Sequence, residues 1–214
     1  MFIFLIWFFG HTVHCQATPE GDYDNNLYKL RSYTWEGDES KQCEMLQKHI
    51  KSYFFKAEDL NFVLSMAATY NREDCVIALL ASGADPKGKA NPDNWDSALF
   101  AAVHGGAYET AKILLSNGSS ISEISEGKEF IFTKIGATPL ETFKEKVVAC
   151  ENYQKILDTN ERSRCVRFIK TIRSKERINA MIQLLSPSIE AHKDENQKEQ
   201  SSVYTESQGE LEKI

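Results

Sequence analysis

The sequence lacks the short motifs by which many enzyme active sites are recognised. It contains no G-x-S-x-G nucleophile turn, no complete GxxxxGK[ST] phosphate loop and no HExxH metal-binding pair. It also has no CxxC pair, and its five histidines are scattered, so the sequence gives no basis for a structural zinc site. We therefore expect no cofactor, no metal and no catalytic residues, as in a protein that is not an enzyme.

Positive charge and long apolar runs are also scarce. The chain has 25 Lys and Arg residues against 31 Asp and Glu residues, a net charge of -6. Binding to nucleic acid needs a basic surface, so we expect no nucleic-acid partner. The apolar run Met1–Phe9 is far shorter than the roughly 20 residues that cross a bilayer, so we expect no stable membrane span.

The apolar N-terminus instead predicts a signal peptide over residues 1–17. The run is typical of the hydrophobic region of a secretory signal, although the basic residues that usually precede it are missing. Cleavage is compatible with a position after Cys15 or after Ala17. An N-terminal anchor or an early core strand is the alternative. We expect a secreted or periplasmic protein, and otherwise a cytoplasmic one.

Four cysteines remain if Cys15 is removed with the signal peptide. An even number is compatible with two disulfides in an exported protein. Cys150 and Cys165 form a possible disulfide, with two unpaired thiols as the alternative. Cys75 falls on the apolar face of a predicted helix, where we expect an unpaired, buried thiol.

An internal repeat is the main structural signal. Residues 64–85 and 99–120 carry the same pattern at an offset of 35 residues, and each copy has room for two helices joined by a tight turn. Small residues allow the first helices to approach closely, and a glycine follows the second helix of each copy. One such pair cannot cover its own apolar surface, so the copies must stack. The matched pairs are Leu64 with Leu99, Ala67 with Ala102, Leu79-Leu80 with Leu114-Leu115, and Gly83 with Gly118.

These segments resemble ankyrin repeats. Leu79–Asp85 and Ile113–Gly118 are similar to the helix ending of that family, and Gly136–Leu140 is similar to its G-x-T-P-L entry motif. The third copy is offset by 41 residues, which indicates a longer finger loop within residues 124–132. Over about residues 60–185 the resemblance implies an all-α, ankyrin-type helical solenoid. It would have about three to four helix-turn-helix repeats, short finger loops and helical caps.

The remaining segments are assigned by composition and periodicity. We expect a linker over residues 18–38, an ankyrin repeat domain with N- and C-terminal capping helices over 39–186, and a disordered acidic tail over 187–214. The alternative for the linker is that its apolar residues Leu27, Tyr28, Leu30, Tyr33 and Trp35 dock on the domain. The tail holds seven acidic residues and three basic ones, with few large apolar groups. Tyr153, Ile156 and Leu157 are candidates for a third outer helix, and the apolar residues between 166 and 185 indicate one further helix pair.

The resemblance also implies a function. Ankyrin proteins bind other proteins through a concave face and finger loops, so we expect a non-catalytic interaction module, monomeric and secreted or effector-like, that modulates a protein partner of unknown identity. One alternative is a periplasmic or secreted immunity or inhibitor protein that neutralises a toxin. Others are an enzyme whose site pairs Cys150 or Cys165 with a base, and a purely structural spacer.

Two surfaces are candidates for partner binding. The first is the finger loop after residue 85 with the inner helix that follows it, where Trp95 is either a projecting anchor or folds back over the stack. The stretch Pro86–Lys89 resembles part of a phosphate loop, but no strand precedes it and we interpret it as a turn. For Phe100 a position in the core is the alternative to partner binding. The candidate partner-binding residues are Lys87, Lys89, Asn91, Asp93, Trp95, Phe100, His104 and Tyr108.

The second candidate surface is a basic patch formed by Arg167, Lys170 and Arg173. These residues recur at three-residue steps within 160–177, a stretch with seven basic and two acidic residues. The spacing predicts that they share one side of a helix. The patch is suited to an acidic partner, a phosphate-rich surface or the chain's own acidic tail, and a solvated face of a cap helix is the alternative.

Overall fold

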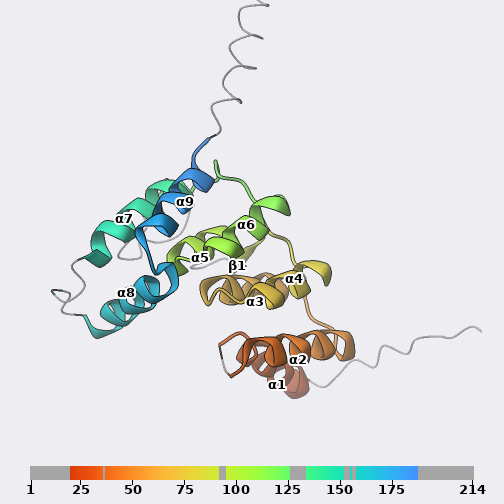
Figure 1. Cartoon of the computed structure of the whole chain (residues 1–214). Coiled ribbons are helices and arrows are strands. Elements are labelled where there is room, and N and C mark those ends of the chain that lie inside the picture. The colour runs from red at the N-terminus through yellow and green to blue at the C-terminus, as the bar shows by residue number, and fades with distance from the viewer. Residues whose placement is uncertain are drawn as a thin grey trace, which may run out of the picture.

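The computed structural model describes residues 20–35, 37–91, 95–125, 134–151, 155 and 158–187. Within them the chain forms helices and one short hairpin, stacked side by side along the molecule (Figure 1). The predicted signal peptide and nearly all of the predicted acidic tail lie outside the described residues. The elements are α1 (Glu20–Ser32), α2 (Glu39–Ser52), α3 (Ala57–Thr69), α4 (Glu73–Ala81), β1 (Lys89–Asn91), β2 (Trp95–Ser97), α5 (Ala98–Gly105), α6 (Tyr108–Ser116), α7 (Pro139–Glu151), α8 (Thr159–Ile172) and α9 (Lys175–Leu185).

The helices are arranged in two layers. Helices α1, α3, α5 and α7 contact one another in that order and form an inner layer, while α2, α4, α6 and α9 form an outer layer in the same way. In Figure 1 the stack runs from α1 and α2 at one end to α7 and α9 at the other. The structure therefore confirms the predicted ankyrin-type solenoid of stacked helix pairs.

Local sequence signals define where several helices begin and end. Asp38 caps α2 by accepting a hydrogen bond from the backbone N–H of Lys41 at 3.1 Å. Thr138 and Glu141 form a reciprocal capping box before α7, in which the backbone N–H of Thr138 donates to Glu141 at 2.8 Å. At the other end, Gly83 and Gly118 follow α4 and α6 with φ angles of 95° and 105°. Glycine adopts this left-handed conformation at little cost, as the repeat pattern predicts.

A continuous apolar core runs between the two layers. The matched alanines Ala67 and Ala102 are fully buried, so α3 and α5 pack closely. At the C-terminal end, the rings of Phe143 on α7 and Phe168 on α8 lie 5.9 Å apart between centroids. Full burial of each large apolar side chain is worth about 1.5–3 kcal/mol, so this core is the main source of stability. Its largest members are Phe143, Phe168, Leu30, Leu46, Leu64, Leu79, Leu99, Leu114, Met181 and Leu185.

A two-stranded antiparallel hairpin is the only departure from helix among the elements of the described residues. Strand β1 pairs with β2, with Lys89 opposite Ser97 and Asn91 opposite Trp95. The hairpin is the finger predicted between the first two repeats, and it leads directly into α5. Its base is tied to α3, because the side chain of Asn61 accepts a hydrogen bond from the backbone N–H of Asp85 at 2.8 Å.

The predicted linker over residues 18–38 is wrong for most of its length. Residues 20–32 form α1, which packs against α3 at the start of the inner layer. Leu27, Leu30 and Tyr33 are buried there. This segment is too polar to be recognised as a helix by average composition, but its few apolar residues meet the exposed end of the first repeat and cover it.

The C-terminal part also differs from the expected order of helices. The outer position beside α6 is taken by α9, and α8 is inserted between α7 and α9, where it contacts both α5 and α7. Tyr153, Ile156 and Leu157, predicted to supply the third outer helix, lie outside the described residues. The third repeat is therefore a helix pair, α7 with α9, whose connection contains an additional helix.

Two disulfides join neighbouring helices. Cys150 on α7 is bonded to Cys165 on α8, and Cys43 on α2 is bonded to Cys75 on α4. The prediction of an unpaired thiol at Cys75 is wrong: the side chain is buried on the apolar face as expected, but Cys43 lies in the adjacent outer helix. The periodicity of one helix gives no information about which residue of another helix packs against it.

Candidate functional site

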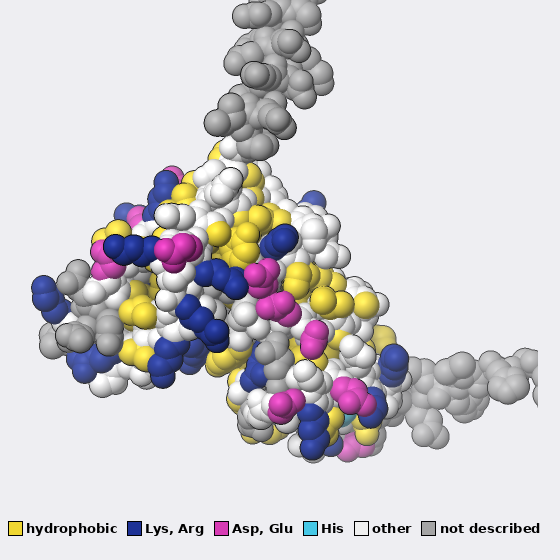
Figure 2. Space-filling model, in the orientation of Figure 1, with side chains coloured by type: hydrophobic (Ala, Val, Ile, Leu, Met, Phe, Trp, Pro, Cys, Tyr) yellow, Lys and Arg dark blue, Asp and Glu magenta, His cyan; other side chains and the backbone are white. Residues whose placement is uncertain are grey.

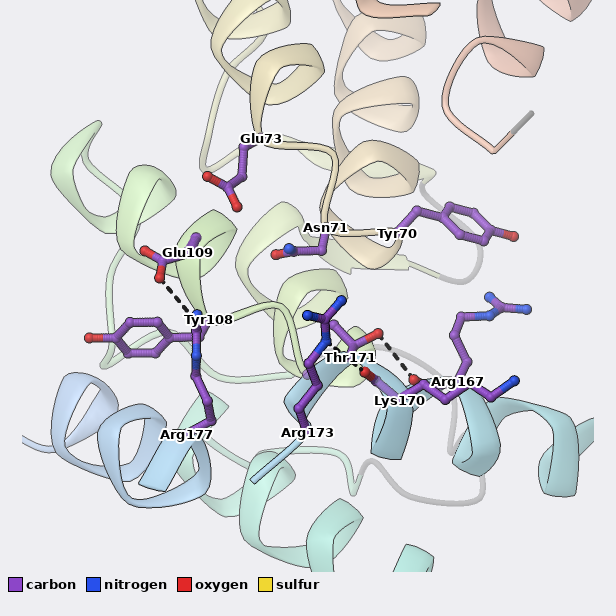
Figure 3. Close-up of a pocket in the computed structure, with 11 residues that line it drawn as sticks. Tyr70, Asn71, Glu73, Tyr108, Glu109, Arg167, Lys170, Thr171, Arg173 and Arg177 are labelled. Atoms are coloured by element: carbon purple, nitrogen blue, oxygen red, sulfur yellow. Dashed lines mark hydrogen bonds and ion pairs between the residues drawn. The ribbon is translucent and has the colours of Figure 1, made fainter. Parts of the chain in front are cut away.

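A groove lies where the turns between paired helices meet the end of α8 (Figure 3). Its volume is 490 Å³. Its walls come from the α3–α4 turn, the α5–α6 turn, the end of α8 and the start of α9. We call it the basic groove, since four of its side chains are basic and two are acidic. It is lined by Tyr70, Asn71, Glu73, Gly106, Tyr108, Glu109, Arg167, Lys170, Thr171, Arg173 and Arg177.

Each end of the basic groove carries an arginine beside a tyrosine ring. The Arg167 guanidinium lies 4.7 Å from the centroid of the Tyr70 ring, and the Arg177 guanidinium lies 5.3 Å from that of Tyr108. Arg177 also donates a hydrogen bond of 2.9 Å to Glu109. Cation–π contacts of this kind contribute about 0.5–1 kcal/mol at exposed sites and hold the arginines in place. Figure 3 shows the two pairs at opposite ends of the groove.

Lys170 and Arg173 lie between these two ends. Both side chains are exposed. Arg173 ends α8 with a φ angle of 61°, and its Nε donates to the backbone carbonyl of Lys170 at 3.3 Å. On the opposite wall, Asn71 has a φ angle of 54°, and its side-chain oxygen accepts a hydrogen bond from Thr110 at 3.0 Å. The groove therefore has cations on one wall and, on the other, the side-chain amide of Asn71, which the hydrogen bond from Thr110 holds in place.

Two helix N-termini also lie at the basic groove. Helices α4 and α6 begin at Glu73 and Tyr108, which both line it, and no side chain caps either helix. The first N–H groups of a helix lack intrahelical partners and carry the positive end of the helix dipole. Glu73, Asp74 and Glu109 lie in the first turns of these helices and offset their positive ends, so the positive potential of the groove comes mainly from Arg167, Lys170 and Arg173.

A buried cluster of ionisable side chains lies behind the groove, between α5, α7 and α8. Lys146 and Glu161 are buried, His104 is half-buried, and Arg164 forms an ion pair with Glu161. Burial lowers the pKa of Lys146 to about 8, opposed by the charge of Glu161. Burial likewise lowers the pKa of His104 to about 3, and the charges of Lys146 and Arg164 act in the same direction. The cluster keeps His104 neutral at physiological pH and joins α8 to the repeat stack.

The side chain of Asp158 caps the N-terminus of α8, and its contribution to the free energy of unfolding can be measured. The Asp158 side chain accepts a hydrogen bond from the backbone N–H of Glu161 at 2.8 Å. We expect Asp158→Ala to lower the free energy of unfolding by about 1 kcal/mol, while Asp158→Asn, which preserves the acceptor, changes it by a few tenths. Urea titration of both variants measures the difference. Equal losses in the two variants would contradict a capping role.

The predicted basic patch comes together in the basic groove with Tyr108, which was predicted on the inner-helix face and instead begins the outer helix α6. Arg167, Lys170, Arg173 and Tyr108 all line the groove. Phe100, also predicted to bind a partner, is only 2% exposed and belongs to the core, so that prediction is wrong. Its position on α5 faces the stack because the apolar face of this short helix extends over most of its circumference. His104 lies in the buried cluster behind the groove.

The finger residues lie apart from the basic groove. Lys87 and Lys89 are exposed at the base of the hairpin, whereas Asp93 and the side chains of Asn91 and Trp95 are outside the description. The hairpin precedes the first residue of α5, and the groove contains Gly106, just after its last residue. The two surfaces are therefore at opposite ends of α5, separated by about 12 Å of helix.

Several groove residues were missed by the sequence analysis, although one carried a signal. At the 35-residue offset, Asn71 corresponds to Gly106, and both have positive φ angles. Asparagine is one of the few residues that tolerate this conformation, so the repeat register marks Asn71 as part of a tight turn. No comparable signal identifies Tyr70, Glu73 or Thr171, which join the groove only through the packing of α8.

The described residues offer no nucleophile of the kind that the enzyme hypothesis requires. Cys150 and Cys165 are bonded to each other, so neither thiol is free to pair with a base. Gly83–Lys89 follows the spacing G-x-x-x-x-G-K, but Ala90 replaces Ser or Thr, and the stretch follows a helix instead of a strand. No cluster of three or more His, Cys, Asp or Glu suited to a metal occurs within the described part of the chain.

Comparison with known proteins identifies the repeat. Residues 64–126 match the family model described as "Ankyrin repeats (many copies)". The match spans α4, the hairpin, α5 and α6, together with the C-terminal part of α3 from Leu64 onward. A search of the curated proteins finds no significant match to the chain. Of the helices in the described segments, none is both long and apolar enough to cross a membrane.

Proposed function

We propose that the chain, whose residues 64–126 match ankyrin repeats, binds a partner protein through the basic groove without catalysing a reaction. Ankyrin repeats form protein-interaction modules, in which stacked helix pairs provide an extended binding surface. The observation that carries the proposal is the pair of arginine–tyrosine contacts at the two ends of one groove.

The composition of the groove supports binding to a protein. Arginine and tyrosine are enriched among the residues that contribute most to protein–protein affinity, because they combine a large contact area with directional hydrogen bonds. Tyr70 and Tyr108 are half-buried, so their rings are held by the stack while part of each remains accessible. The ion pair of Arg177 with Glu109 is substantially exposed, with 47% and 36% of the side chains accessible, and it orients both residues at the rim.

We also propose that the protein is secreted or periplasmic. Disulfides persist in oxidising compartments and are rare in the cytosol. Both bonds join neighbouring helices of the stack, and all four cysteines are buried. The apolar N-terminal run is consistent with export, and sequencing the N-terminus of the mature protein tests it. A mature protein that begins at Met1 would contradict cleavage of a signal peptide.

Charge reversal in the basic groove tests the binding proposal. Lys170→Glu places an acidic group between the two arginine–tyrosine pairs, and we expect recovery of the partner from the source or target cell to fall about tenfold. Lys112→Glu is a matched control, because Lys112 is also an exposed helical lysine but lies outside the groove. Quantitative affinity purification with the wild type and both variants measures the effect. Equal recovery by all three would refute binding through the groove.

The finger loop remains a second candidate contact, and the same experiment tests it. Its predicted residues are Lys87, Lys89, Asn91, Asp93 and Trp95, and Trp95→Ala removes the aromatic anchor. If Trp95→Ala abolishes recovery and Lys170→Glu does not, the partner binds at the finger end of α5 instead of at the groove.

A further inference from the structure

The cations of the basic groove are distributed along it. Figure 3 shows Arg167 at one end, Arg177 at the other, and Lys170 and Arg173 in between. A site for a single phosphate would require these donors to converge on one point. The separated cations instead match a ligand that carries several negative charges along its length.

The spacing of the cations suits an extended peptide. Arg173 directly follows α8 and is six positions after Arg167, a spacing of about 9 Å at the rise of an α-helix. Side chains on one face of an extended peptide recur every second residue, at about 7 Å. Because arginine and lysine side chains are long, carboxylates at alternate positions of such a peptide can each reach a cation of the groove.

The other groups in the groove match the backbone of a peptide. The Asn71 side-chain oxygen is already occupied by Thr110, which leaves the amide N–H groups to donate to a ligand carbonyl. Glu73 and Glu109 place two carboxylates in the same groove, and Glu109 accepts a hydrogen bond from Arg177. Carboxylates repel a continuous polyanion such as nucleic acid or a sulfated glycan, so their presence favours a ligand that has both donors and acceptors.

The surrounding surface limits the length of the acidic ligand. Figure 2 shows Lys and Arg side chains gathered over α8 and α9, with Asp and Glu side chains beside them toward α4. The whole chain carries a net charge of -6. A long polyanion would extend over these acidic regions, whereas a short segment fits within the groove, whose 490 Å³ is typical of ligand-sized pockets.

From these observations we infer that the basic groove binds a short, extended acidic segment of a protein, with carboxylates at alternate positions. The inference rests on the proposed function and specifies the chemistry of the partner. In the bound arrangement, Arg167 and Arg177 pair with the outer carboxylates, Lys170 and Arg173 pair with those between them, and Asn71 holds the peptide backbone.

Fluorescence anisotropy with synthetic peptides tests the inference on the full chain. The probe is a fluorescein-labelled peptide of alternating serine and glutamate, and the reference peptide has glutamine in place of each glutamate. We expect the acidic peptide to bind at least tenfold more tightly than its glutamine counterpart, and its affinity to fall as salt is raised. Lys170→Glu is expected to weaken binding of the acidic peptide about tenfold, while Lys112→Glu leaves it within twofold.

Three outcomes would overturn the inference. They are equal binding of the two peptides, equal effects of Lys170→Glu and Lys112→Glu, and tighter binding of a heparin oligosaccharide or a single-stranded oligonucleotide than of the acidic peptide. The purification experiment distinguishes a failure of this inference from a failure of the proposed function. If Lys170→Glu still abolishes partner recovery, the groove is the interface and only the ligand chemistry is wrong. If recovery is unchanged while the acidic peptide binds, the proposed function fails.

Discussion

Replacing both Cys43 and Cys75 by alanine is expected to lower the free energy of unfolding by about 3–4 kcal/mol. The bond closes a loop of 32 residues, and a cross-link stabilises the folded state mainly by restricting the unfolded chain. Both side chains are buried against the core, so replacement by alanine also removes sulfur contacts between α2 and α4. For a chain of this size the loss corresponds to a fall in Tm on the order of 10 °C, measurable by calorimetry.

The second disulfide provides the matched control. The Cys150–Cys165 bond closes only 15 residues, and the same entropic argument gives a loss of about 3 kcal/mol for its alanine variant. The locations of the two effects should also differ. Hydrogen exchange is expected to accelerate first in α1 and α2 for the Cys43/Cys75 variant and in α8 for the Cys150/Cys165 variant, because each repeat is supported only by its neighbours. Uniform acceleration in both variants would contradict this assignment.

Lowering the pH is expected to destabilise the protein at pH values well above those at which carboxylates titrate. The pKa of His104 is about 3 in the folded state against an ordinary value of 6.5. Between these values the unfolded chain binds a proton at this position that the folded chain does not, so stability falls as the pH is lowered. From pH 8 to pH 5 the expected loss from His104 is about 2 kcal/mol.

His104→Gln removes this titration and is expected to eliminate about 2 kcal/mol of the pH dependence, measured by urea unfolding at pH 8, 6 and 5. His49→Gln is the control. Burial also lowers the pKa of His49, but the hydrogen bond that its ring donates to the backbone carbonyl of Asn26 opposes the shift, so its contribution has the same sign and is smaller. Glu141, whose pKa is lowered by hydrogen bonds from Thr138, becomes protonated mainly below this range. An unchanged pH dependence in His104→Gln would show that another group is responsible.

The acid effect has a consequence for binding, because His104 faces the helix that supplies the groove. Lys146 of α7 and Arg164 of α8 lie close enough to lower its pKa, and Glu161 is paired with Arg164. Protonation of His104 would add a third cation to this buried site. The cost would be relieved by separation of α8 from α5, which would also displace Arg167 and Lys170.

The repeat itself was predictable because its signals are local. Matched alanines at 67 and 102 and glycines at 83 and 118 have the same physical role in each copy, so an offset of 35 residues is visible without any tertiary information. The buried faces of α3 and α5 follow from the same alignment. The all-α solenoid could be inferred from these particular positions alone.

Only one wall of the groove could be predicted from the sequence. The three-residue spacing of Arg167, Lys170 and Arg173 indicates a shared helix face, but the opposite wall comes from Tyr70 and Asn71, almost a hundred positions earlier. Their meeting depends on α8 lying across α5 and α7. The apolar stripe of α8 shows which face of the helix is buried, but it does not specify the helices against which that face packs.

The two disulfides also determine how the molecule responds to a pulling force. When a stacked repeat protein is stretched from its ends, it lengthens as each helix pair unravels. The bond between Cys43 and Cys75 would prevent 32 residues, about 110 Å of extended chain, from lengthening. The bond between Cys150 and Cys165 would do the same for a further 15 residues, about 50 Å. Under tension the helix pair α3 with α4 would come apart mainly through α4, since α3 lies inside the closed loop.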